Sequence, residues 1–339
     1  MAQKLTLNAT QINQFVDHAQ RSLNFHGTVL LVQGNDTILY KGYGYSNPKN
    51  KVLTDKTTAY NIASVTKGFT AVAILKLVEE GKLSLQHPLN IYFNDVPKNK
   101  ATITIHQLLN HTSGIGQHYA ADGEENQVKA VHNILKLPLT DSPGKRFIYS
   151  NDNYTLLAII IERVTGETWE SYIRRCILVP LAMNATFFQA DYPQVAQAKI
   201  PRLDGTVPDR TKRDYGNTGA TGLFSTAADL ASFQRALSTN KLLTDQSKEL
   251  LFGKYTKIAS LWPETTSYYG YGLFVTETKN SPLERIWLRG NEDRWGTCAT
   301  FWLPTIDATL IVLSTSLSLS NGSKPHLYIS DGILKSILN

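Results

Sequence analysis

Ser64-Val65-Thr66-Lys67 is the most informative stretch of this 339-residue chain. A serine and a lysine three residues apart stand at the start of an apolar run that includes Phe69, Val72 and Leu75. The spacing predicts a helix, in which residues i and i+3 share one face, so Lys67 would lie beside the Ser64 hydroxyl. A serine nucleophile needs such a neighbour to take its proton. Backbone N–H groups at a helix start also favour a developing oxyanion.

Taken alone, Ser-x-x-Lys also fits a helix N-cap followed by a solvated lysine, because serine is a preferred N-cap residue. Tyr149-Ser150-Asn151 favours the catalytic interpretation. It follows a Ser-Pro-Gly turn and precedes the apolar run 156–161, which predicts a buried helix. A phenol beside an ammonium is expected to have a lowered pKa, so Tyr149 could act as general base on Ser64. Asn151 could hydrogen-bond Lys67 and the substrate. The alternative is a surface Tyr-Ser-Asn turn.

Four further segments agree in order and spacing with one known family. They are Gly42-Tyr43-Gly44-Tyr45-Ser46-Asn47, Leu108-Leu109-Asn110-His111-Thr112-Ser113-Gly114, Pro180-Leu181-Ala182-Met183 and Thr221-Gly222-Leu223-Phe224-Ser225-Thr226-Ala227-Ala228-Asp229-Leu230. With Ser-x-x-Lys and Tyr-x-Asn, they make the chain resemble the β-lactamase and penicillin-binding protein family over roughly residues 20–316. The branch it resembles contains class C β-lactamases, DD-peptidases and related serine esterases. The resemblance implies catalytic roles for Ser64, Lys67, Tyr149 and Asn151, and a structural role for His111.

The third family motif, Lys-Thr-Gly or His-x-Gly on a strand lining the site, does not occur between residues 283 and 302. Counting back from Pro304 places Arg289-Gly290-Asn291 on the motif, and Glu292 then supplies a backbone N–H to the oxyanion hole. This register keeps a cation but replaces the glycine by Asn291. A register shifted by one residue aligns Gly296 better with the family pattern, but it leaves no cation at the first position of the motif. We therefore prefer the first register.

Arginine cannot shuttle a proton, but it can hold a carboxylate through two parallel hydrogen bonds. The alternative for Arg289 is a surface ion pair with Glu284, Glu292 or Asp293. The altered motif weakens the case for β-lactam turnover or peptidoglycan cleavage more than the case for ester hydrolysis.

The resemblance implies an α/β (α+β) fold of the β-lactamase/transpeptidase type. N- and C-terminal strands would form one antiparallel sheet flanked by helices, with a mostly helical lobe inserted. Sequence patterns predict a helix over 327–338 and strands over 27–33, 37–42, 271–276, 286–289, 299–303 and 309–315. We expect a single unit over 1–339, divided into a sheet subdomain (1–78 and 216–339) and a helical subdomain (79–215).

Composition narrows the functional classes. Hydrophobic residues make up 42% and charged residues 18% of the chain, so a large core is expected and disorder is not. The net charge is +6, yet the only dense basic run is Arg210-Thr211-Lys212-Arg213, so nucleic acid is not an expected partner. We interpret this run as a solvated loop, or as a lip that attracts anionic polymers or acidic substrates. Two cysteines and scattered histidines indicate neither a metal site nor a cofactor.

No apolar segment is long enough for a transmembrane helix or a signal peptide. We expect a cytoplasmic protein if Met1 is the native start, and otherwise an exported or cell-surface protein whose signal has been removed. The sequence carries no signal for an oligomeric state.

We therefore predict a serine hydrolase that acts through an acyl-enzyme on ester or amide carbonyls of a small-molecule or peptidoglycan-like substrate. Ser64 attacks, Tyr149 and Lys67 share its proton, and backbone N–H groups of Ser64 and Glu292 stabilise the oxyanion. A carboxylesterase or DD-peptidase ranks above a true β-lactamase. The alternative is a penicillin-binding-type protein with little turnover, which binds carboxylate ligands through Arg289.

Overall fold

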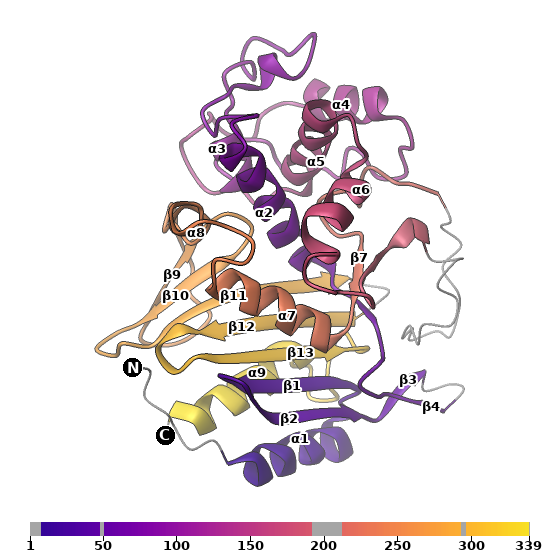
Figure 1. The fold of residues 1–339 in the computed structure, drawn as a ribbon, viewed down its shortest axis with the longest axis vertical. Coiled ribbons are helices and arrows are strands. Elements are labelled where there is room, and N and C mark those ends of the chain that lie inside the picture. Colours follow the sequence, from indigo (N-terminus) through magenta and orange to yellow (C-terminus); the bar gives the residue numbers. More distant parts are fainter. Residues whose placement is uncertain (1–7, 48–50, 192–211, 293–295, 339) are drawn as a thin grey trace.

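A large antiparallel sheet with helices on both faces dominates the structure, and a helical lobe lies beside it (Figure 1). This computed structural model describes residues 8–47, 51–191, 212–292 and 296–338. Strands from the two ends of the chain share the sheet, because β1 pairs with both β2 and β13. The predicted mixed α/β architecture is confirmed.

The main sheet has eight strands, each antiparallel to its neighbours. In spatial order they are β2 (Asp36–Tyr43), β1 (Gly27–Gln33), β13 (Ala308–Ser314), β12 (Gly296–Leu303), β11 (Glu284–Glu292), β10 (Phe274–Thr278), β9 (Thr265–Tyr269) and β8 (Thr256–Ile258). Two small sheets are formed by β3 (Tyr45–Asn47) with β4 (Val52–Leu53), and by β5 (Tyr60–Asn61), β7 (Leu223–Ser225) and β6 (Phe187–Phe188).

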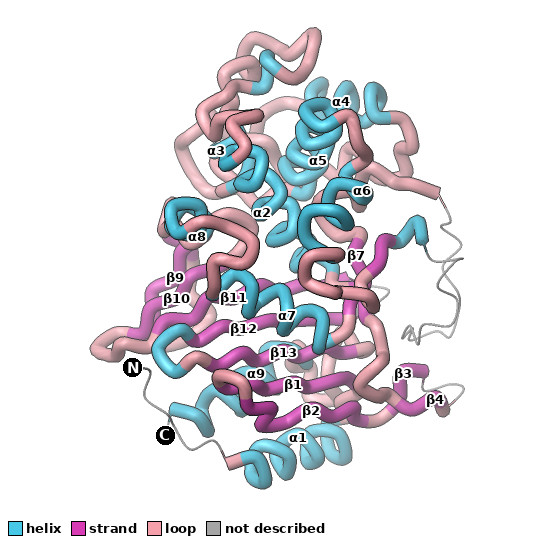
Figure 2. The backbone as a smooth tube through the Cα atoms, viewed as in Figure 1, coloured by secondary structure: helices cyan, strands magenta, loops and turns pink. Residues whose placement is uncertain are grey.

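The α-helices fall into two groups, which Figure 2 distinguishes from the strands and the long loops. Those that cover the sheet are α1 (Ala9–Leu23), α7 (Ala227–Ser238) and α9 (Pro325–Leu338), with α8 (Asp245–Leu251) above its β8–β10 end. Those of the lobe are α2 (Thr66–Glu79), α3 (Ile105–Leu109), α4 (Gln127–Lys136), α5 (Asn151–Thr165) and α6 (Trp169–Ile173), which continues as the π-helical turn η3 (Arg174–Leu178). Short 3-10 turns are η1 (Ala63–Val65), η2 (Leu89–Ile91) and η5 (Pro304–Ile306).

Both faces of the sheet are covered, so strand β13 near its middle is apolar at most positions. In β13, Leu310 and Val312 belong to the apolar cluster that contains residues of α1 and α9. Ile311 and Leu313 belong to the other cluster, which contains residues of α7, α2 and the lobe. This alternation follows from the two-residue period of a strand.

Helix α2 joins the sheet to the lobe, and its amino end fixes the position of Ser64. Gly68 lies so close to β11 that an added Cβ would come within 2.5 Å of Leu288 Cδ2. Phe69 stacks on Phe233 of α7 with 3.9 Å between ring centroids. The start of α2 is therefore packed tightly between β11 and α7.

The predicted strand over 271–276 is wrong at its first half. Tyr271 lies in the turn between β9 and β10, where Gly272 has a φ of +72°, and β10 begins at Phe274. Neither β8 nor β9 was predicted. The predicted terminal helix is α9, which begins at Pro325, a residue suited to a first helical position. The division into two subdomains remains a prediction.

Candidate active site

Ser64 lies in the turn η1, directly before α2. Its neighbour Ala63 has a φ of +44°, a left-handed conformation that costs a non-glycine residue about 1 kcal/mol or more. The turn is held by the Asn61 side chain, whose Oδ1 accepts a hydrogen bond from the Ala63 N–H at 2.7 Å. Such a strained backbone persists because its surroundings fix it, and it places Ser64 at the surface of a cleft.

Lys67 is buried, with 1% of its surface exposed, so the alternative of a solvated lysine is wrong. Its Nζ donates to Ser64 Oγ at 3.0 Å, to Asn151 Oδ1 at 2.8 Å and to the Ala220 carbonyl at 3.1 Å. Three acceptors match the three protons of an ammonium group. The N-cap alternative for Ser64 is also wrong, because Val65 holds that position in α2.

Tyr149 lies on the loop before α5, as predicted, and its hydroxyl donates to Ser64 Oγ at 2.8 Å. Burial raises the pKa of Tyr149 to about 12, although the Ser64 hydrogen bond and the charge of Arg289 act in the opposite direction. The predicted lowering of this pKa is therefore wrong, because desolvation outweighs the Ser64 hydrogen bond and the charge of Arg289. At neutral pH the Tyr149 hydroxyl of the free protein is therefore protonated.

An aromatic cluster fixes the Tyr149 ring. The centroid of His111 is 4.5 Å from that of Tyr149, and Tyr269 meets the same ring edge-on at 6.4 Å. His111 is fully buried, and its Nδ1 accepts hydrogen bonds from the Ser150 N–H and the Asn153 side chain. Burial lowers the His111 pKa well below its usual value, so the ring is neutral. These contacts fit the structural role expected for His111.

Asn151 begins α5 and connects Lys67 to another wall of the cleft. Its side chain accepts the Lys67 hydrogen bond, while its backbone N–H donates to Gln117 Oε1 at 2.5 Å. Gln117 also lines the cleft but was not predicted from the sequence, since it lies on a loop without periodic pattern. Ala220, the other Lys67 partner, directly precedes the Thr221–Gly222 segment that carried the family resemblance.

Strand β11 presents the altered third motif to the same cleft. Arg289 and Asn291 line it, whereas Gly290 faces the turn before Ser64. A Cβ on Gly290 would come within 2.3 Å of the Ile62 carbonyl oxygen. The strand therefore approaches the turn that holds Ser64 at a position that only glycine fits.

The alternative for Arg289 was a surface ion pair with Glu284, Glu292 or Asp293. Glu284 pairs with Lys254 at 3.0 Å, and Arg289 forms no ion pair within the described ranges. Its guanidinium carbon lies 5.5 Å from the Phe274 ring centroid. Asp293 lies outside the described residues. Glu292 is the last residue of β11 and pairs with Gly296, and its role in the oxyanion hole remains a prediction.

The cleft around Ser64 has a volume of about 1030 Å³. Its walls come from the loop at Gln117, the segment before Tyr149, the edge strand β8, β11 and the start of α9. The volume exceeds that of a typical small-molecule pocket. The cleft can therefore take an extended substrate across the Ser64 hydroxyl.

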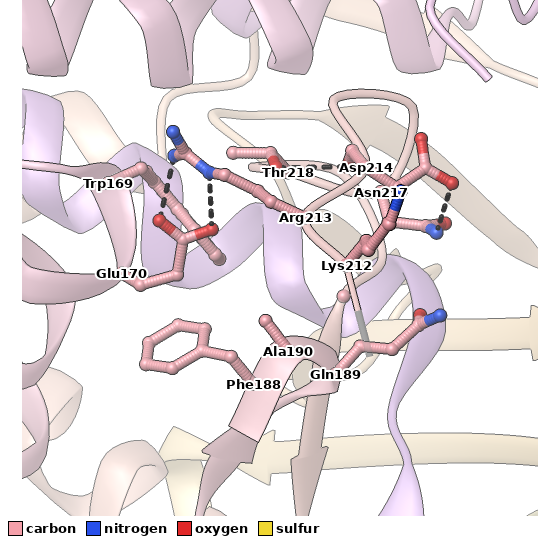
Figure 3. Close-up of a pocket in the computed structure, with 11 residues that line it drawn as sticks. Trp169, Glu170, Phe188, Gln189, Ala190, Lys212, Arg213, Asp214, Asn217 and Thr218 are labelled. Carbon is pink, nitrogen blue, oxygen red and sulfur yellow. Dashed lines mark hydrogen bonds and ion pairs between the residues drawn. The ribbon is translucent and has the colours of Figure 1, made fainter. Parts of the chain in front are cut away.

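A second hollow, drawn in Figure 3, shares no lining residue with the Ser64 cleft and measures only about 20 Å³. It contains Arg213, whose guanidinium makes two hydrogen bonds to Glu170, at 2.7 and 3.0 Å, and also pairs with Glu162. The interpretation of this basic run as solvated is wrong for Arg213, which is partly buried in an ion-pair network. Arg210 and Thr211 lie outside the described residues, as does most of the loop before them.

Other chemistries find little support in the described part of the chain. Cys298 and Cys176 are buried, and burial raises both thiol pKa values. Within the same ranges, no group of three or more His, Cys, Asp or Glu side chains is placed to hold a metal ion. No helix among those residues is long and apolar enough to cross a membrane.

Comparisons with known proteins identify the family of this chain. A family model described as Beta-lactamase matches residues 12–330. PbpX of Bacillus subtilis (strain 168), named as a penicillin-binding protein, is 30% identical over 270 residues, which cover 78% of this chain and 65% of PbpX. The chain spans between 43% and 65% of the length of the curated relatives that it matches.

Solved structures show the same fold. The octameric penicillin-binding protein homologue from Pyrococcus abyssi has a TM-score of 0.83 at 27% identity, covering 98% of this chain and 78% of its own. A D-amino acid amidase from Ochrobactrum anthropi has a TM-score of 0.79 at 22% identity, covering 98% and 99%, a likeness of fold alone. With a family match over nearly its whole length, the chain belongs to the β-lactamase family.

Proposed function

We propose that this protein is a serine hydrolase that forms an acyl-enzyme on Ser64 with ester or amide substrates. The observation that carries the proposal is the convergence of Lys67 Nζ and Tyr149 OH on Ser64 Oγ, at 3.0 and 2.8 Å, in an open cleft. A serine nucleophile is activated by an adjacent group that can take its proton, and two ionisable side chains lie within hydrogen-bond reach of Ser64.

The two neighbours have different tasks in the mechanism that we propose. Both donate to Ser64 in the resting geometry, so Lys67 first releases a proton to solvent and its neutral amine then accepts the Ser64 proton. Tyr149, still protonated, donates its proton to the leaving group and regains one from Lys67. Water then hydrolyses the acyl-enzyme. Acid–base help of this kind contributes about 10²–10⁴ in rate.

Substrate preference follows from β11. The Ser64 N–H and, in the preferred register, the Glu292 N–H would hold the oxyanion, while Arg289 would hold a carboxylate. The Asn291 side chain stands where the family motif has glycine and narrows the path of an extended substrate. We therefore rank a carboxylesterase or a DD-peptidase-like hydrolase above a true β-lactamase.

Hydrolysis of p-nitrophenyl butyrate by the wild type and by Ser64→Ala tests the proposal. We expect the variant to lose activity by about 10³-fold or more, since it lacks the nucleophile. Ser336→Ala is the matched control, because Ser336 is an exposed serine of α9 that does not line the cleft. Equal activity of Ser64→Ala and the wild type would contradict the mechanism.

The second candidate is a penicillin-binding-type protein with little turnover. The observation that favours it is that Asn291 lines the cleft, at the position that the preferred register gives to the motif glycine. Stable labelling of Ser64 by a fluorescent penicillin, without release of the label and without ester turnover, would support this candidate over the hydrolase.

A further inference from the structure

The Ser64 cleft is lined by cationic side chains from four separate segments. Lys145 and Arg146 lie just before Tyr149, Lys257 lies on β8, Arg289 on β11, and Lys324 directly before α9. Among the described lining residues, none is acidic. The whole chain has 34 basic and 28 acidic residues, so a typical part of its surface would carry both signs. The cleft is thus markedly more positive than the chain as a whole.

Most of these cations lack a protein counter-charge. Arg146 pairs with Asp141 at 2.6 Å. The other four cations form no ion pair with any residue that the structure describes. Like charges that face one cleft repel each other, and bound anions would relieve this repulsion.

The amino end of α9 adds buried donor groups at one end of this cationic surface. The first N–H groups of a helix have no intrahelical acceptor and favour anions. His326, in the first turn, is 3% exposed and lines the cleft, and its Nδ1 is buried without a hydrogen-bond partner. Burial, together with the charges of Arg289 and Lys324, lowers the His326 pKa to about 3. The ring is therefore neutral and can donate one hydrogen bond.

We propose that the substrate of this hydrolase carries at least two anionic groups. Arg289, Lys324 and His326 at the start of α9 bind one of them, and Lys145 with Arg146 beside Tyr149 binds another. The inference rests on the proposed function, because it names the substrate class of that site. A single carboxylate held by Arg289 does not account for the remaining cations. An ester or amide borne on a phosphate- or carboxylate-rich molecule does.

Binding can be measured without turnover, by titration calorimetry on the full-length Ser64→Ala variant at low ionic strength. We expect tripolyphosphate or citrate to bind at least about tenfold more tightly than acetate, with an affinity that falls as NaCl is added. The two polyanions distinguish phosphate from carboxylate groups. Lys324→Gln and Lys145→Gln, each introduced into this variant, should weaken polyanion binding about tenfold. Lys129→Gln is the control, because Lys129 is an exposed lysine of α4 outside the cleft.

Polyanion binding no tighter than that of acetate, or equally weakened by Lys129→Gln, overturns the inference. Turnover separates it from the proposed function. We compare two p-nitrophenyl esters, one with a neutral and one with a dianionic acyl group. The ester with the dianionic acyl group should have the higher kcat/KM. If the two esters have equal kcat/KM values that depend on Ser64, the two-anion substrate is wrong and the proposed hydrolase function stands. If polyanions bind tightly in the cleft but no ester is turned over in a Ser64-dependent way, the two-anion site stands and the proposed hydrolase function is wrong.

Discussion

For Tyr149, the pKa expected from the sequence and the pKa in the structure differ in direction. Its position beside Ser64 follows from the Tyr-x-Asn spacing and the family resemblance. Its protonation state does not, because the pKa depends on how the folded chain removes water from the phenol, and burial raises it to about 12. The protonation state of Tyr149 in the free protein is therefore set by packing.

Tyr149→Phe tests this assignment through the leaving group. If Tyr149 is the acid, its loss should lower kcat/KM about 10²–10⁴-fold for an alkyl ester or an amide, whose leaving group needs a proton. It should lower kcat/KM much less for a p-nitrophenyl ester, since p-nitrophenolate leaves unprotonated. Loss of equal size on both substrates would show that Tyr149 acts as the base.

Asp152 gives a pH dependence of stability beside the cleft. It is 2% exposed, its Oδ1 accepts a hydrogen bond from the Ala120 N–H, and burial raises its pKa from 3.8 to about 6. The folded protein therefore holds this proton more tightly than the unfolded chain does. The resulting stabilisation is complete below pH 3.8 and is lost as the pH rises through about 6.

Asp152→Asn should remove this contribution, which is worth about 3 kcal/mol at most. Urea unfolding of both proteins at pH 4 and pH 7 measures it. We expect the free energy of unfolding to change less between the two pH values in the variant. An unchanged pH dependence in the variant would assign the effect to other groups.

Among the elements, β11 has the largest influence on the site. Its residues alternate between the cleft and the turn that holds Ser64, so a single strand both lines the cleft and packs against that turn. Gly290 allows this approach, because any side chain there would meet the Ile62 carbonyl.

Gly290→Ala should separate β11 from the Ser64 turn. The obstructing atom belongs to the backbone and cannot rotate away, so we expect a loss of about 1–3 kcal/mol in unfolding free energy. The displaced strand should also lower Ser64-dependent kcat/KM. Chemical denaturation and ester hydrolysis measure the two effects. A variant with wild-type stability and activity would contradict the tight contact.

The predictable elements were those with strong, locally encoded patterns. The strand over 27–33 was predicted with its observed bounds, because residues 28–32 are β-branched or apolar and a Gly34-Asn35-Asp36 turn signal follows. Strands β8 and β9 are short and rich in polar residues, so their pairing depends on the rest of the sheet. Lys257 and His326 were not predicted as parts of the cleft, because neither lies near the Ser-x-x-Lys or Tyr-x-Asn motif in the sequence.

At the scale of the whole molecule, one apolar cluster runs through both the sheet and the lobe. It includes Leu288 and Ile311 from the sheet together with Ile159 and Ile177 from the lobe. We therefore expect one cooperative thermal transition, with equal calorimetric and van't Hoff enthalpies. Differential scanning calorimetry, together with near-ultraviolet circular dichroism, measures this. Two resolved transitions would show that the proposed subdomains melt independently.

The pairing of β1 with β13 also constrains how a cell can make this protein. Gly27 pairs with Ser314, so the ribosome has released most of the polypeptide before the partner of β1 exists. Until then the β1–β2 hairpin has an open edge, which can join the edges of other nascent copies. We therefore expect productive folding to require that this edge stay shielded until residues 308–314 have been synthesised and can pair with it.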